Sequence, residues 1–440
     1  MNLWLFKVDR QSEIKRSPNN PWSILQASIF VLPFFPLLGE IGLFSVLVRV
    51  WGRDFKYIIR NPLNWGWLLL TVWLIVNSFF AYRPTEAWLG LANFLPFFAL
   101  FIAVSRAIDN CQQLYRLAWL LIIPSVPIVF LGLGQLYLNW ESPLLIANVL
   151  GWSLVPLGVP EGRMSSVFIY ANFLAIYLSF TLILTVGLWL YSCYDKQKKN
   201  IICLSFILII NSIGLLFANS RNSWLIVFLA CLAFALYLSW YWLIAGITAT
   251  IGIILGASFG DFWGQQWLRK IVPQIVWGRL SDTMYPDRPI ETLRITKWQF
   301  CQLKIQERPL IGWGLRNFTP LYLEATNFWF GHPHNLFIML SLEIGIVATL
   351  FLCLIVGYIL GRTIKSVFID PKLELTKKNK LIVFTYLITF ISCILFNLFD
   401  VTLFDLRVNT ISWLILAAIS GIGMQSTKLK SSEIIDWDKI

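Results

Sequence analysis

Charged residues are scarce in this sequence of 440 residues: Asp, Glu, Lys and Arg together make up 13%, whereas hydrophobic residues make up 58%. Soluble domains need more charge on their surface, so the composition excludes an ordinary soluble protein. Apolar runs of about twenty residues recur along nearly the whole chain, and each can cross a membrane as a helix. An outer-membrane barrel is excluded, because its strands would be about ten residues long and alternate in polarity. The sequence therefore predicts an all-α fold, a polytopic transmembrane helical bundle.

Close cysteine pairs are also absent. The seven cysteines form no CxxC motif, and most lie inside apolar runs or beside them: Cys111, Cys193, Cys203, Cys231, Cys301, Cys353 and Cys393. This spacing indicates small buried hydrophobic residues, not a disulfide framework or a metal site. The first apolar run begins near Ser23 without a small-residue cleavage site, so we expect no cleavable signal peptide.

Basic residues exceed acidic ones and give a net charge of +12, but their positions indicate membrane lipid as the partner and not nucleic acid. Both flanks of the first apolar stretch, Ser23 to Val50, are basic, which is typical of the cytoplasmic side: Lys7, Arg10, Lys15 and Arg16 before it, and Arg49, Arg53, Lys56 and Arg60 at its end. Two prolines, Gly39 and Glu40 lie in its middle. We therefore expect a hairpin of two short or tilted helices that turns at Gly39 and Glu40.

Ten further apolar spans bring the expected total to about 12 transmembrane helices, with both termini cytoplasmic. They lie at about 63–80, 86–105, 114–138, 167–191, 201–218, 222–239, 241–258, 334–361, 381–399 and 408–424. The predicted organisation is a cytoplasmic tail (1–22), transmembrane helices 1–9 (23–259), one large extracytoplasmic loop (260–333), transmembrane helices 10–12 (334–424) and a second cytoplasmic tail (425–440).

The large loop contains two stretches in which apolar residues recur at helical spacing. One runs from Phe262 to Ile275, and the other, from Leu293 to Gln306, mixes aromatic residues with Arg294 and Lys297. Both predict amphipathic helices that lie at the membrane surface or cap the bundle. A lid over an outward-facing cavity would have this composition.

The protein has only two histidines, His332 and His334, separated by Pro333 where the large loop enters a membrane helix. A histidine near neutral pH can take a proton from a hydroxyl group or bind a metal ion. The alternative is that both rings cap the helix or lie at the headgroup level. A metal site is less favoured, because a third histidine and a nearby thiol are absent and acidic residues are few.

Arginine, but not lysine, occurs in the short outer loops. Arg163, Arg221 and Arg407 each lie at or near a helix end, where an arginine often only anchors the helix at the interface. Several arginines converging on one cavity would instead suit a diphosphate, because the guanidinium group binds phosphate oxygens in pairs. Asp400 and Asp405 are expected to pair with Arg407, and Glu343 to be structural.

The motifs together resemble the O-antigen ligase and polymerase superfamily. The resemblance is carried by Arg308-Pro309-Leu310-Ile311-Gly312-Trp313-Gly314, by His334-Asn335 followed by Glu343 and Gly345, by Ser220-Arg221 and by Gly162-Arg163. It implies a metal-independent, inverting glycosyltransferase of the plasma (inner) membrane without a cofactor. Such an enzyme moves a glycan from a polyprenyl diphosphate carrier to a lipid or glycan acceptor at the periplasmic face.

The resemblance also implies roles for single residues. His334 would be the general base for the acceptor hydroxyl, and Arg163 and Arg221 would hold the diphosphate. Arg316, beyond the Pro/Gly turn, and His332 would be further substrate contacts.

Two alternatives stay open at this point. A polymerase, which extends the glycan, shares these residue types with a ligase, which attaches the finished glycan to an acceptor. Some relatives have been named inorganic-carbon transporters, but a transporter should carry ionisable residues deep within its spans. Here the histidines and arginines lie at the outer face, which favours chemistry there.

Overall fold

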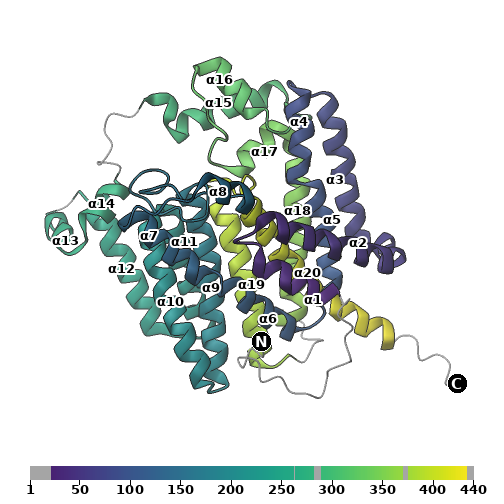
Figure 1. Cartoon of the computed structure of the whole chain (residues 1–440), viewed down its shortest axis with the longest axis horizontal. Coiled ribbons are helices and arrows are strands. Elements are labelled where there is room, and N and C mark those ends of the chain that lie inside the picture. Colours follow the sequence, from purple (N-terminus) through teal and green to yellow (C-terminus); the bar gives the residue numbers. More distant parts are fainter. Residues whose placement is uncertain (1–20, 262, 282–288, 370–374, 434–440) are drawn as a thin grey trace.

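The computed structural model describes residues 21–261, 263–281, 289–369 and 375–433, and all regular elements in these ranges are helices (Figure 1). Eight of them are long and apolar enough to cross a membrane: Pro84–Ala107 (α4, η2 and α5), Cys111–Tyr137 (α6 and α7), Ala171–Tyr194 (α9), Lys198–Ala218 (α10), Tyr241–Phe259 (α12), Ile346–Ile369 (α18 and η4), Lys377–Phe396 (α19) and Leu406–Met424 in α20 (Leu406–Glu433). The all-α membrane bundle is thus confirmed, while the count of twelve spans stays a prediction.

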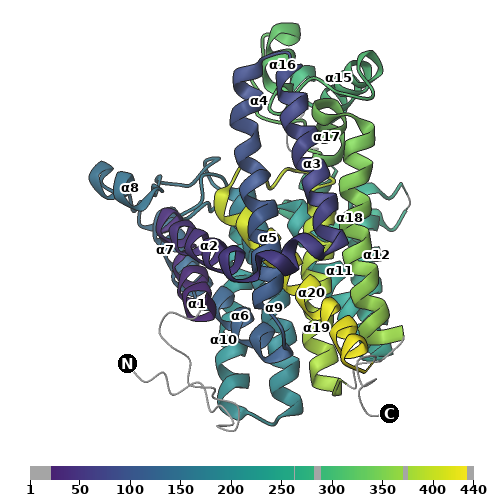
Figure 2. The same cartoon turned by 90° about the vertical axis from the view of Figure 1, so that its right-hand side faces the viewer.

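Three further helices coincide with predicted spans but are shorter or less apolar: α1 (Pro21–Val31), α3 (Pro62–Phe79) and α11 (Arg221–Tyr237). α1 packs against α2 (Pro36–Arg60), so the first apolar stretch is a helical hairpin as expected. In Figures 1 and 2, α2 runs across the long axes of the other helices.

The predicted turn at Gly39 and Glu40 is wrong. Both residues lie inside α2, and the chain reverses at Leu32–Phe35, next to the two prolines. Proline fixes its own φ and lacks a backbone N–H, so Pro36 begins a helix more readily than it continues one. Gly39 instead lets the two helices approach, since a Cβ there would collide with Leu32, and Glu40 accepts a hydrogen bond from Thr410.

α9 and α20 form the centre of the bundle. In their most apolar stretches, 83% and 89% of the residues are buried, against 17% in α12 at the periphery. α9 contacts α10 and α19, and α20 contacts α5 and α18. Gly187 in α9 admits Thr385 of α19, as small residues do where membrane helices pack closely. Polar side chains of this core also form hydrogen bonds between helices, for example Asn211 Nδ2 of α10 to Thr181 Oγ1 of α9.

The large loop covers one end of the bundle, the upper end in Figures 1 and 2. It contains α13 (Gln265–Ile271), α14 (Gln274–Leu280), η3 (Ile290–Thr292), α15 (Arg294–Glu307) and α16 (Phe318–Thr326). The chain then turns through both histidines into α17 (Leu336–Ile344). α17 and α18 (Ile346–Ile364) divide the predicted span 334–361 at Gly345, whose φ of 85° is left-handed.

The backbone just before α4 (Pro84–Gly90) is joined to the large loop by hydrogen bonds. Tyr82 N donates to the Trp313 carbonyl over 2.8 Å, and Arg83 N donates to the Asn317 side chain over 2.8 Å. Gly314 packs against Ala81 with no space for a side chain. The segment around Arg316 is therefore fixed to the bundle and is not a free loop.

Candidate active site

The turn that carries the two histidines is held from both sides. On one side, Trp298 of α15 donates from Nε1 to the Pro333 carbonyl over 2.9 Å. On the other, Asn335 caps α17 by accepting from Ile338 N, and its Nδ2 donates to the Leu398 carbonyl after α19. These bonds fix His334 in a left-handed conformation with φ of 59°. These hydrogen bonds hold the histidine turn between α15 and the loop before α20.

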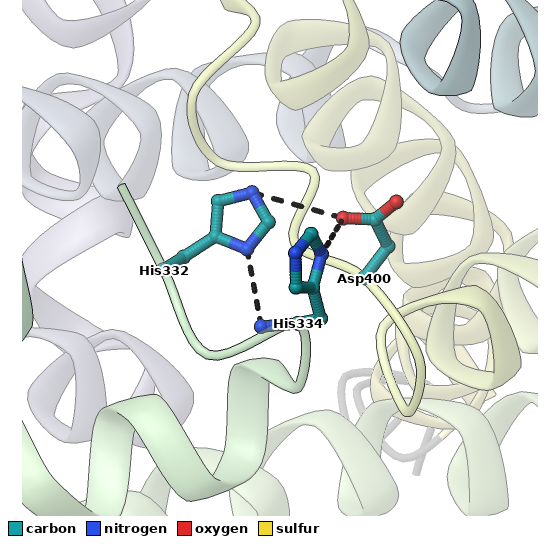
Figure 3. A group of neighbouring side chains, drawn as sticks. All are labelled: His332, His334 and Asp400. Carbon is teal, nitrogen blue, oxygen red and sulfur yellow. Dashed lines mark hydrogen bonds and ion pairs between the residues drawn. The ribbon is translucent and has the colours of Figure 1, made fainter. Parts of the chain in front are cut away.

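Both imidazole rings face one carboxylate, that of Asp400 in the loop between α19 and α20 (Figure 3). His334 Nδ1 lies 3.3 Å from Asp400 Oδ1, and His332 Nε2 lies 3.7 Å from the same oxygen. The backbone N–H of His334 donates to His332 Nδ1 over 3.2 Å. Because Nδ1 of His332 is an acceptor, the neutral ring carries its proton on Nε2, directed at Asp400.

Burial and hydrogen bonding set the charges in this group. Burial would raise the pKa of Asp400, but the His334 hydrogen bond and the surrounding positive charges hold that pKa at about 2. Burial lowers the pKa of His332 to about 3, although the Asp400 charge opposes this. Near neutral pH the carboxylate is therefore ionised and the His332 ring is neutral.

Asp400 is tied to a further polar chain on its other side. Its Oδ2 accepts from Asn172 Nδ2 over 2.6 Å, and Asn172 Oδ1 accepts from Arg163 Nη2 over 2.7 Å. Arg163 Nε donates to the Ala218 carbonyl at the end of α10 over 3.0 Å. The guanidinium group is thus two side chains away from His334 and holds the carboxylate in place.

A cavity of about 700 Å³ lies in front of the histidines. His332, His334 and Asp400 form part of its wall, and so do Arg83, Glu86 and Arg316. The rest is mostly apolar or aromatic: Ile169, Tyr170, Asn172, Phe173, Thr319, Pro320, Leu323, Trp329, Phe330, Gly331 and Phe404. Such a lining offers surfaces on which sugar rings and a lipid chain can pack beside a few charged groups.

Two arginines of the cavity wall are each paired with a carboxylate, so that the α4 region is joined to the large loop. Arg316 Nε lies 3.2 Å from Glu86 Oε2, and Arg83 pairs with Glu324 of α16. All four side chains are between 37% and 53% exposed. These pairs are weak enough for an anionic ligand to compete with the carboxylates.

The predicted site residues thus fall into two groups. His332, His334 and Arg316 line the cavity. Arg163 and Arg221 are not among the described residues that line it. Arg221 begins α11, half-buried, three residues after the Ala218 carbonyl that Arg163 binds. The roles of all five residues stay proposals.

The expected pairing of Asp400 with Arg407 is wrong. Arg407 pairs with Asp405 at 3.0 Å, donates to the Val167 carbonyl and packs over the Phe168 ring. It is 3% exposed, so a buried guanidinium here joins helix ends and has little access to a ligand. Asp400 instead contacts both histidines.

Sequence reasoning assigned no site role to three further residues: Asn172, which donates to Asp400; Arg83, which lines the cavity; and Lys297, whose charge acts on His332. The signal for Asp400 was a carboxylate at the end of an apolar span, at the same level as the histidines. No local pattern marked Asn172.

Histidine and aspartate are common metal ligands, and the donor atoms of His332, His334 and Asp400 lie within 4.8 Å of one another. The hydrogen bond from His334 N to His332 Nδ1 argues against that use, because it leaves a proton on the nitrogen that faces Asp400. The geometry fits an imidazole–carboxylate network better than a metal centre.

Two comparisons with known proteins bear on this site. Residues 204–353 match the family model described as O-antigen ligase, a region that runs from α10 into α18 and includes both histidines. A Rickettsia conorii protein whose name proposes a polysaccharide ligase is 32% identical over 102 residues. That match covers 20% of this chain and 24% of the relative. The resemblance to the O-antigen ligase superfamily is thereby confirmed, with residues 204–353 as the region that carries it.

Proposed function

We propose that this membrane protein is an O-antigen ligase-type glycosyltransferase, which moves a glycan from a polyprenyl diphosphate carrier to a hydroxyl of a lipid or glycan acceptor. The observation that carries the proposal is His334, which lines the cavity while its Nδ1 is bonded to the buried Asp400. The family match supports the same class of reaction. We place the cavity at the periplasmic face of the plasma membrane, as the basic residues at the opposite ends of the spans indicate.

In the proposed mechanism, each group has one role in a one-step displacement at the anomeric carbon. Asp400 accepts a hydrogen bond from Nδ1–H of His334, so Nε2 carries the lone pair that removes the acceptor hydroxyl proton. The acceptor oxygen then bonds to the anomeric carbon as the bond from that carbon to the diphosphate oxygen breaks. The lipid diphosphate leaves with the bonding electrons, and Asp400 stabilises the imidazolium that forms. One base and no protein nucleophile give inversion.

Negative charge grows on the leaving diphosphate, and the cavity offers cations to meet it. Arg316 and Arg83 are in the wall, and Arg163 and Arg221 lie near the α10–α11 turn behind it. We propose that Arg316 contacts the diphosphate directly and that Arg163 acts mainly through Asn172 and Asp400. Arg221 would bind the diphosphate if the donor reaches the helix end.

A deletion strain complemented with wild type or His334→Ala tests the function. We expect wild type to restore long-chain glycan on the acceptor lipid and His334→Ala to leave the acceptor bare, with equal amounts of folded protein in the membrane. Acceptor lipid with a single repeat would indicate a polymerase instead. An unchanged glycan ladder with reduced bicarbonate uptake would contradict the proposal and indicate transport.

A further inference from the structure

Lys297 of α15 is a buried lysine beside the histidines that the mechanism above leaves unused. The residue is 1% exposed, and its ammonium lies 3.6 Å from the centre of the Phe330 ring, which lines the cavity. Its neighbour Trp298 is bonded to the Pro333 carbonyl, so this part of the helix is seated on the histidine turn. Within the described ranges, no hydrogen bond or ion pair reaches the ammonium.

A buried ammonium group that contacts only the face of an aromatic ring leaves its three N–H donors without acceptors, which costs free energy. Burial, together with the charge of Arg294 one turn earlier, lowers the pKa of Lys297 to about 8, and Asp400 opposes the shift only in part. Among the described residues, the carboxylate whose charge acts on Lys297 is Asp400, and it already accepts hydrogen bonds from His334, Asn172 and Val401 N. A methionine or leucine would fill this position at lower cost.

The surrounding charges indicate what would compensate the ammonium. The charged and titratable groups that face it are Arg294 from the same helix, Asp400 from the loop before α20, and His332 in the turn. Positive charge therefore exceeds negative charge before the reaction, and protonation of His334 would add another positive charge. A site with this excess of positive charge is complementary to a ligand that is negatively charged and becomes more negative during the reaction.

We propose that Lys297 is an electrostatic residue of the substrate site, whose buried charge is balanced by the diphosphate oxygens of the lipid-linked donor. This inference rests on the proposed function. Because the Lys297 ammonium is buried against Phe330, a residue of the cavity wall, its charge is screened less than that of an exposed lysine. The lysine thus destabilises the empty protein and stabilises the complex.

The first test separates stability from binding. Lys297→Met should unfold at a higher temperature than wild type at pH 7, by about 2 °C or more, because it removes an uncompensated buried charge. Lys304→Met is the matched control: Lys304 lies on the same helix but pairs with Glu307 at 2.8 Å. An unaltered or lower unfolding temperature for Lys297→Met would show that the lysine is well compensated in the empty protein and would overturn the inference.

The second test measures protons taken up when the anion binds. Farnesyl diphosphate is titrated into detergent-solubilised full-length protein at pH 8, in two buffers of different ionisation enthalpy. An anion near Lys297 raises the pKa of the ammonium, so wild type and Lys304→Met should take up part of a proton. Lys297→Met and Lys297→Gln should lose this uptake and bind about tenfold more weakly.

The outcomes distinguish this inference from the function on which it rests. If wild type does not bind farnesyl diphosphate, both fail. If wild type binds and both Lys297 variants bind equally well with equal proton uptake, only the role of Lys297 fails. Glucuronate serves as a carboxylate probe, and uptake that depends on Lys297 with glucuronate but not with the diphosphate would also overturn the assignment.

Discussion

At the scale of single residues, the candidate site is arranged around one carboxylate that faces two histidines. His334 Nδ1 is hydrogen-bonded to Asp400 Oδ1 over 3.3 Å, and His332 Nε2 lies 3.7 Å from the same oxygen. The orientation comes from backbone bonds and from Asn172, so the imidazole needs little reorganisation when it takes a proton.

Asp400→Asn should reduce glycan transfer by about a hundredfold or more, because an amide no longer holds the Nδ1 proton nor stabilises the imidazolium. The turnover of purified protein with a lipid-linked donor measures this. Glu161→Gln, an exposed change elsewhere at the outer face, should leave turnover unaltered. Near-normal turnover in Asp400→Asn would remove the carboxylate from the mechanism.

Asp400 should also contribute to the acid stability of the protein. Its folded-state pKa of about 2 is below its ordinary value of 3.8, so the unfolded chain binds more protons between these limits. The contribution is therefore complete above pH 3.8 and is lost as the pH falls through about 2. Thermal unfolding in detergent between pH 2 and 5 should show a steeper decline for wild type than for Asp400→Asn; parallel curves would contradict this.

At the scale of elements, the site depends on interruptions in helices that a hydropathy pattern does not reveal. The run 334–361 is apolar enough along its whole length to predict one span, yet the helix is interrupted at Gly345. The break lets Trp313 N and Gly314 N donate to the carbonyls of Leu342 and Glu343. The side chain of Glu343 is buried and accepts from Phe318 N, in keeping with the structural role expected for it.

Gly345→Ala should destabilise the protein strongly, because a Cβ there would collide with the Leu310 carbonyl and the left-handed φ disfavours alanine. Gly357→Ala, in α18 with open space around the Cα, should be neutral or slightly stabilising. Unfolding temperatures in detergent compare the two. Equal effects would mean that the junction of α17 and α18 is not a fixed feature.

These elements also show what could be predicted from the sequence. Helix positions, the long loop between α12 and α17 and the interest of both histidines followed from local hydropathy and residue type, which act within one segment. The Asp400 and Asn172 contacts join positions 66 and 228 residues apart, and a lone carboxylate gives no sign of its partner until the helices pack. The α1–α2 turn was misplaced because two candidate breakers, the prolines and Gly39, compete within a few residues.

At the scale of the whole molecule, the large loop and the basic helix ends should lie on opposite sides of the membrane. A single cysteine at Glu324, on α16, should react with an impermeant maleimide added to intact spheroplasts. A single cysteine at Lys199, at the start of α10, should react only after lysis. The seven native cysteines are first replaced by alanine or serine. Labelling of both positions from outside would overturn the orientation.

The network around His334 has a consequence for how this kind of protein can be divided. The matched family region ends at residue 353, whereas Asp400 follows it and Asn172 and Arg163 precede it. The matched region therefore contains His334 and the side chains of Trp298 and Asn335 that hold its turn, but not the carboxylate that its ring contacts. A truncated or recombined chain that keeps only this segment would lose Asp400 and Asn172, so we expect the proposed activity to require the assembled bundle and not to be transferred with that segment.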